Sequence, residues 1–169
     1  MGPWLKGCIL LLDLGYFKYL FFDRIDRYGG YFVSRLKRKR NANPLIVAAN
    51  RKWRGNSIDV VGKRLRDVLP LLKREVLDVE VEVKFKLKRR KYRGKQSMVN
   101  RRFRLVCVFN KESGKYHTYL ANIPVEILAA EDIARLYAAR WEIELIFKEL
   151  KSHYHMVQIP SASEIYLPI

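Results

Sequence analysis

Four polar residues near the C-terminal end of the sequence recur at helical spacing, and their side chains are of types that can bind a cation or a phosphate. The segment 130–152, AEDIARLYAARWEIELIFKELKS, has helical periodicity. At about 100° per residue, one stripe of this helix contains Tyr137, Arg140, Glu144 and Lys151. A carboxylate binds a hard cation through oxygen, whereas arginine and lysine neutralise phosphate. The stripe is therefore able to bring a metal ion and a phosphodiester together.

The same helix also has an ordinary interpretation as a solvated face. Arg140–Glu144 and Glu144–Lys148 are i,i+4 pairs of opposite charge, each worth about 0.2–0.5 kcal/mol. Trp141 and Lys148 flank the polar stripe. We expect a second, apolar stripe to face a core; its members are Leu136, Ala139, Ile143, Ile146, Phe147 and Leu150.

A further carboxylate follows an apolar run near the start of the chain. The run 8–12, CILLL, has the length and composition of a strand that is buried on both faces, and it ends at Asp13. Open α/β sheets place their sites at the carboxyl ends of strands. Asp is also a common N-cap, so capping of the next helix is an alternative role for Asp13.

Both stretches resemble the IS4-type DDE transposases. The spacing from Tyr137 to Lys151 is similar to the Y-R-E-K signature of that family, and RW-x-IE-x-x-FK-x-LK, residues 140–151, resembles its catalytic helix. The segment LLLDLGYF, which contains Asp13, resembles the segment that carries the second catalytic aspartate.

The resemblance implies a role for each of these residues. Asp13 and Glu144 are expected to be catalytic carboxylates that bind Mg²⁺ (or Mn²⁺). The residues expected to contact the DNA of the transposon ends are Tyr137, Arg140 and Lys151, together with Lys148 and Trp141.

The elements around Asp13 predict a strand–helix–strand unit. Residues 16–27 form an amphipathic pattern in which Asp23, Asp26 and Arg27 face away from the apolar side. Gly29 and Gly30 end this helix, and 31–36 reads as a second strand. Two strands joined by a helix within about 30 residues predict a parallel pair.

The middle of the chain is basic and rich in predicted strands. Alternation predicts a half-exposed strand over 78–88, and further strands are expected over 101–109 and 116–120. A basic loop, 89–95, joins the first two. We therefore expect an α/β fold, which the resemblance identifies as a partial RNase H-like core interrupted by a basic β-rich insertion. The expected domains are the first part of the core at 1–39, the insertion at 40–122, and the returning catalytic helix at 123–169.

The charge of the chain indicates a polyanionic partner. The net charge is +17, and residues 35–104 hold 24 Lys and Arg against 6 Asp and Glu, an excess of 18. The family resemblance identifies the partner as DNA, with a homodimer in the intact transposase. A basic protein that binds nucleic acid without catalysis would show the same total charge.

Cysteine and hydropathy patterns favour a reducing, cytoplasmic setting, and the family resemblance implies association with the nucleoid of a prokaryote. Cys8 and Cys107 lie in separate apolar runs and are expected to be buried free thiols. No run approaches the roughly 18 apolar residues of a membrane span.

The resemblance also predicts what the chain does not supply. The family's first catalytic aspartate lies on a strand before the one at Asp13, and residues 1–12 contain no acidic residue. We therefore expect a transposase-derived fragment that is inactive alone. Two alternatives are a non-catalytic nucleic-acid-binding protein and an independent RNase H-like nuclease that uses another carboxylate, such as Asp23 or Asp59.

Overall fold

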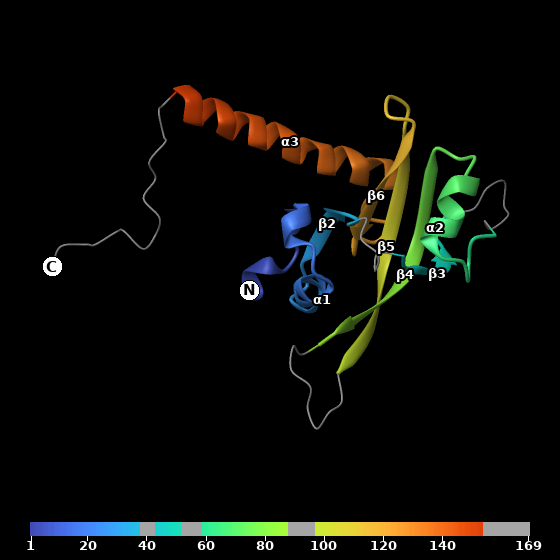
Figure 1. The fold of residues 1–169 in the computed structure, drawn as a ribbon. Helices are drawn as coiled ribbons and strands as arrows, with labels where there is room; N and C mark the ends of the chain where they lie inside the picture. Colours follow the sequence, from blue (N-terminus) through green and yellow to red (C-terminus); the bar gives the residue numbers. More distant parts are fainter. Residues whose placement is uncertain (38–42, 52–58, 88–96, 154–169) are drawn as a thin grey trace. The chain divides into compact units, whose positions relative to one another are not determined.

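A computed structural model describes residues 1–37, 43–51, 59–87 and 97–153 (Figure 1). It divides into a compact unit from Met1 to Tyr137 and a second unit that begins at Ala138, within the long helix α3 (Ala130–His153). The first unit contains the whole described sheet. None of the described helices is long and apolar enough to cross a membrane.

The described strands form one six-stranded sheet in the order β1-β2-β6-β5-β4-β3 (Figure 1). Only the β1–β2 pair is parallel among the described strands, and the other four pairs are antiparallel. The strands are β1 (Ile9–Leu12), β2 (Tyr31–Arg35), β3 (Leu45–Ala49), β4 (Val76–Lys86), β5 (Met98–Asn110) and β6 (Lys115–Ala121).

The predicted strand–helix–strand unit is present, with a shorter helix than expected. A 3-10 turn, η2 (Leu14–Tyr16), precedes α1 (Tyr19–Arg27), so the α-helix begins three residues later than predicted. Gly29 follows α1 with φ +70°, a conformation that favours glycine. A further short turn, η1 (Pro3–Leu5), lies before β1.

The prediction that β1 is buried on both faces is wrong. Ile9 is exposed and the other three residues of β1 are only partly buried. The reason is the position of β1 at the end of the sheet order, where β2 is its one partner among the described strands. An edge strand leaves one side of its backbone unpaired.

Two apolar clusters cover opposite faces of the sheet. On one face, α1 and the short helix α2 (Leu65–Val68) pack on the alternating residues of β4 and β5, as the pattern predicted. Phe22 and Phe32 stack there with ring centroids 4.4 Å apart. On the other face, the first turns of α3 pack through Ile133 and Tyr137 on β2, β5 and β6.

The strands of the expected insertion are continuous with those of the expected core. β6 pairs with β2 at Val33–Ala121, so the sheet crosses both predicted domain boundaries. The domain division stays a prediction. The sequence interpretation missed β3, α2 and the 3-10 turn η3 (Leu69–Leu71), which contains Pro70 as its second residue.

The expected core-facing stripe of α3 is wrong over its C-terminal half. Ile143 is 51% exposed, Ile146 is 55% exposed, and Leu150 is also exposed. The face that is buried lies nearer the start of the helix, at Ala130, Ile133 and Tyr137.

Candidate active site

Asp13 stands at the carboxyl end of β1 and also caps the turn that follows. Its side chain is exposed, and its Oδ2 accepts a hydrogen bond of 3.3 Å from the Gly15 N–H at the start of η2. The two roles foreseen from the sequence are therefore compatible. A carboxylate has about four lone-pair positions, so the hydrogen bond from Gly15 does not by itself exclude a cation.

Tyr137 lies beside the strand end that carries Asp13. Its ring is 5% exposed and packs against Tyr119, with ring centroids 5.4 Å apart. Its hydroxyl donates a hydrogen bond of 3.4 Å to the Leu12 carbonyl, which immediately precedes Asp13. The fold thus brings together two predicted site residues that are 124 positions apart in the numbering. The phosphate contact expected of Tyr137 stays a prediction.

Arg140 and Glu144 form an ion pair on α3, one turn apart. Arg140 Nη1 donates to Glu144 Oε1. The Arg140 side chain is 19% exposed and that of Glu144 is 49% exposed. The pair is the one foreseen from the i,i+4 spacing, and it occupies the carboxylate that is expected to bind metal.

The three other predicted residues of α3 are less constrained or fall outside the description. Trp141 is 60% exposed and Lys148 is exposed. Lys151 lies within α3, but its side chain is outside the described part of the structure. The predicted approach of Asp13 to Glu144 joins the two units of the chain and stays a prediction.

The orientation predicted for Asp23 is wrong, because this carboxylate is buried. Asp23 is 1% exposed and pairs with Arg27 at 2.9 Å and with Arg101 of β5. A carboxylate held by two guanidinium groups is a poor substitute metal ligand. Asp59, the other substitute considered, is exposed and pairs with Lys63 at 2.9 Å.

A second buried ion pair, Asp78–Arg104, was not foreseen. The alternating pattern of β4 placed Asp78 on the solvent side, yet Asp78 is 2% exposed and Arg104 5% exposed. Arg104 also bonds to backbone carbonyls of the turn that leads into α3. The sequence signal that could have revealed this pair is the presence of a charged residue, Asp78 or Arg104, within each of two strongly apolar strands.

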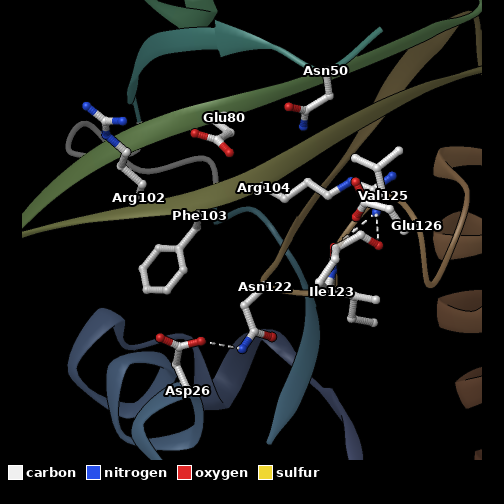
Figure 2. Close-up of a pocket in the computed structure, with 11 residues that line it drawn as sticks. Asp26, Asn50, Glu80, Arg102, Phe103, Arg104, Asn122, Ile123, Val125 and Glu126 are labelled. Atoms are coloured by element: carbon white, nitrogen blue, oxygen red, sulfur yellow. Dashed lines mark hydrogen bonds between the residues drawn. The ribbon is translucent and has the colours of Figure 1, made fainter. Parts of the chain in front are cut away.

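A polar pocket of about 350 Å³ lies beside this ion pair (Figure 2). Asn122 and Asp26 both line the pocket, and Asn122 Nδ2 donates to Asp26 Oδ1 at 2.8 Å and to the Gly30 carbonyl at 2.9 Å. The Asn122 Oδ1 accepts from the Phe32 N–H at 2.8 Å. The predicted site residues do not line this pocket.

The described residues do not by themselves form a metal site. Within them, no three or more His, Cys, Asp or Glu side chains lie where they could share a metal ion. Asp13 and Glu144 have the oxygen donors that Mg²⁺ prefers, but their number falls short of a complete ligand set.

An exposed basic surface lies on the β4–β5 hairpin. Lys84, Lys86 and Arg102 are all exposed, and the pairing register places them on the same face of the two strands. Glu82 lies opposite Arg102 in that register. We call Lys84, Lys86 and Arg102 the hairpin cations. The basic loop 89–95 lies outside the described residues.

Comparisons with known proteins agree on one family. The model of the family described as "Transposase DDE domain" matches residues 1–163. The transposase for insertion sequence element IS231F of Bacillus thuringiensis subsp. israelensis is 27% identical over 173 residues, covering 86% of this chain and 35% of that protein. The transposase for IS1151 of Clostridium perfringens is 26% identical over 176 residues, covering 88% of this chain and 36% of that protein. This chain therefore spans about a third of the length of the curated relatives it matches.

Proposed function

Because the transposase DDE domain model matches residues 1–163, the chain belongs to that family, and we propose that it forms part of the DNA-processing centre of an IS4-type insertion-sequence transposase. Relatives over this region are named as insertion-sequence transposases. DNA strand cleavage and joining, as the activity of the whole protein, belong to this proposal.

One observation carries the proposal: Tyr137 meets the strand end at Asp13. The first residue of the Y-R-E-K signature donates its hydroxyl to the Leu12 carbonyl. The start of the helix that bears the signature therefore contacts the strand that ends in a carboxylate. Ligand sites at the carboxyl ends of strands are the rule in open α/β sheets.

In this proposal the two carboxylates bind metal, and the basic residues bind phosphate. Asp13 and Glu144 hold Mg²⁺ (or Mn²⁺), which would stabilise the charge that develops on a phosphodiester during an in-line displacement. Arg140 and Lys151 neutralise phosphates of the transposon end, with Tyr137, Trp141 and Lys148 beside them. The roles of Tyr137, Arg140, Glu144 and Lys151 follow from their match to the Y-R-E-K signature. Asp13 is assigned by the resemblance of LLLDLGYF, and Trp141 and Lys148 by their position beside the signature stripe.

The architecture is proposed to be that of the family as well. β1, α1, β2 and α3 supply part of an RNase H-like core, and residues 40–122 supply the basic insertion. The working enzyme is proposed to act as a homodimer on DNA in the nucleoid. Because the chain spans about a third of the length of the curated relatives it matches, we expect residues 1–169 assayed by themselves to bind a divalent ion weakly and to leave DNA intact.

A nicking assay on a completed active site tests this function. The chain is joined at its N-terminus to an upstream segment of a relative that brings a further aspartate-bearing strand. Mg²⁺-dependent nicking of DNA is expected, and Glu144→Gln should abolish it while general DNA binding persists. Glu142→Gln is the matched control, since Glu142 is exposed on the same helix outside the signature. Equal loss from both variants would contradict the assignment of Glu144.

A second function is favoured by the contacts that both carboxylates make. Asp13 caps η2 and Glu144 pairs with Arg140, so each has a structural role without a metal. These contacts suit a DNA-binding protein without catalysis. DNA binding together with a completed chain that never nicks, in Mg²⁺ or Mn²⁺, would favour this second function.

A further inference from the structure

The buried pair of Asp78 and Arg104 has a geometry that fixes the direction of the guanidinium group. Arg104 Nε donates to Asp78 Oδ1 at 3.0 Å, and Nη2 donates to Asp78 Oδ2 at 2.6 Å. Asn50 Nδ2 donates to the same Oδ1 at 3.0 Å. A bidentate fork allows one orientation of the planar guanidinium. The remaining nitrogen, Nη1, is therefore aimed by its partner on β4.

Nη1 points into the turn that precedes α3. It lies 2.7 Å from the Leu128 carbonyl oxygen, 3.0 Å from that of Ile123 and 3.3 Å from that of Pro124. Figure 2 shows the Arg104 side chain extending from β5 toward this turn. Buried carbonyl groups need donors. The two N–H groups of Nη1 thus serve mainly the carbonyls of Leu128 and Ile123, because the Pro124 carbonyl also accepts from the backbone N–H groups of Ile127 and Leu128 at 3.2 Å.

Burial decides which contact controls the start of α3. The Arg51–Glu131 ion pair also joins the first turn of the helix to the end of β3, but its side chains are 51% and 41% exposed. Water and salt screen such a pair. The side chains of Asp78 and Arg104 are 3% and 5% exposed, so the contacts between them are screened far less.

We propose that Arg104 is a positioning residue: by holding the turn 123–128, it sets where α3 begins and keeps Tyr137 against the strand end at Asp13. The functional meaning of this placement rests on the proposed function. With a rise of about 1.5 Å per residue, Tyr137 lies roughly 10 Å along the helix from Ala130, so a tilt of about 10° at the start moves it by about 2 Å. The 3.4 Å bond from its hydroxyl to the Leu12 carbonyl would not survive that movement.

Buried ion pairs often contribute little net stability relative to apolar residues of the same size, so stability alone does not explain why this one is present. An apolar pair would fill the same space between β4 and β5. It would offer no donor to the carbonyls of Ile123, Pro124 and Leu128. The pair thus specifies the conformation of the turn 123–128, and the proposal predicts that loss of the pair destabilises mainly this turn and the start of α3.

Amide hydrogen exchange on the whole chain, with and without Arg104→Lys, tests the proposal. Lysine keeps the charge, but it lacks the fork that binds Asp78 and reaches the carbonyls together. We expect amides of residues 127–137 to exchange faster by roughly tenfold to a hundredfold, the change that corresponds to lost hydrogen bonds to a charged group. Amides of the β4–β5 ladder should change less. A uniform change across both regions means a general structural role and overturns the proposal.

Arg101→Lys is the matched control on the same strand. Arg101 binds the buried Asp23 of α1, on the opposite face of β5 from Arg104. Its substitution should loosen α1 and leave 127–137 protected. Selective loosening of 127–137 by Arg101→Lys as well would overturn the assignment to Arg104.

A second variant keeps the test decisive if Arg104→Lys does not fold. Asp78→Asn preserves shape and removes the charge that orients the guanidinium, so it should also loosen 127–137 selectively; uniform loosening overturns the proposal. DNA binding by the unmodified chain is measured in parallel. Its absence would contradict the proposed function, whereas the exchange pattern alone decides the positioning role.

Discussion

Neutralising the hairpin cations should reduce the salt dependence of DNA binding by a calculable amount. Lys84, Lys86 and Arg102 are exposed on the same face of β4 and β5. Each cation that contacts a phosphate releases counterions and adds about 0.9 to the slope of log K against log salt for duplex DNA. The triple variant to glutamine should therefore lower the slope by about 2.7 if all three contact phosphate.

The size of this effect is easy to measure. Between ~50 and ~200 mM salt, a slope difference of about 2.7 corresponds to a change of about 40-fold in the ratio of the two affinities. Fluorescence anisotropy with a labelled short duplex, titrated at several salt concentrations, gives the slope. Binding should depend little on duplex sequence, because phosphate contacts carry no base information.

A matched control separates a defined surface from net charge. Lys63, Lys111 and Arg135 are exposed cations that pair with carboxylates at 2.8–3.0 Å. Replacing these three with glutamine removes the same charge, and it should lower the slope by less than about 1, that is, by less than one phosphate contact. Equal slopes for the two triple variants, or a flat salt response of the unmodified chain, would refute the reasoning.

Two further predictions concern single groups. Burial raises the pKa of the Cys107 thiol to about 12, whereas Cys8 is exposed. An alkylating reagent at neutral pH should therefore modify Cys8 in the folded chain and Cys107 only after denaturation; rapid modification of both would contradict the buried position of Cys107. The hydrogen bond from Arg51 lowers the pKa of Glu131 below its ordinary value of 4.5, so it gives the folded chain stability that is present above pH 4.5 and is lost as the pH falls through the folded-state pKa. Arg51→Gln should therefore shift acid unfolding to higher pH at low salt, and an unchanged acid transition would contradict this.

The strands and helices that were predictable are those with strong local patterns. The alternation on β4, the apolar run of β1 and the helical period of α3 each predicted an element that is present. β3 was missed because its five residues, LIVAA, follow a dense charge run, and a short apolar run has no period of its own. Its assignment comes from pairing with β4, which is a non-local contact.

The buried carboxylates show what a local pattern cannot supply. Asp23 and Asp78 both fall at positions that alternation or helical period assigns to solvent. Each is buried because an arginine of β5 reaches it, from 78 positions away for Asp23 and from 26 for Asp78. Such partners depend on strand register, so the period of one segment does not reveal them. The burial predicted for Cys8 is wrong for a related reason, since Cys8 precedes β1, which lies at the edge of the described sheet.

The position of Tyr137, one of the predicted site residues, has a physical reason that the helical period does not reveal. Tyr137 was placed on a polar stripe, yet it is buried with Ile133, one turn earlier, because the first turns of α3 pack on the sheet. That packing is what brings its hydroxyl to Leu12. The family signature located the residue, and only the tertiary contact showed its neighbour. Further along α3, the helical period predicted that Ile143 faces the core, but this side chain is exposed.

The Arg140–Glu144 ion pair leads to a last prediction, that a divalent metal ion competes with Arg140 for the Glu144 carboxylate. If Glu144 binds a divalent ion, Arg140 must give up or share its acceptor. An exposed i,i+4 pair is worth about 0.3–0.5 kcal/mol, so Arg140→Ala should tighten Mn²⁺ binding by about twofold, and Glu144→Gln should weaken it. Electron paramagnetic resonance of free Mn²⁺ at low salt measures both. Arg135→Ala is the control, because it removes the same charge from α3 but pairs with Asp132. If both alanine variants act equally, net charge explains the effect; if Glu144→Gln changes nothing, Glu144 is not a metal ligand on this chain.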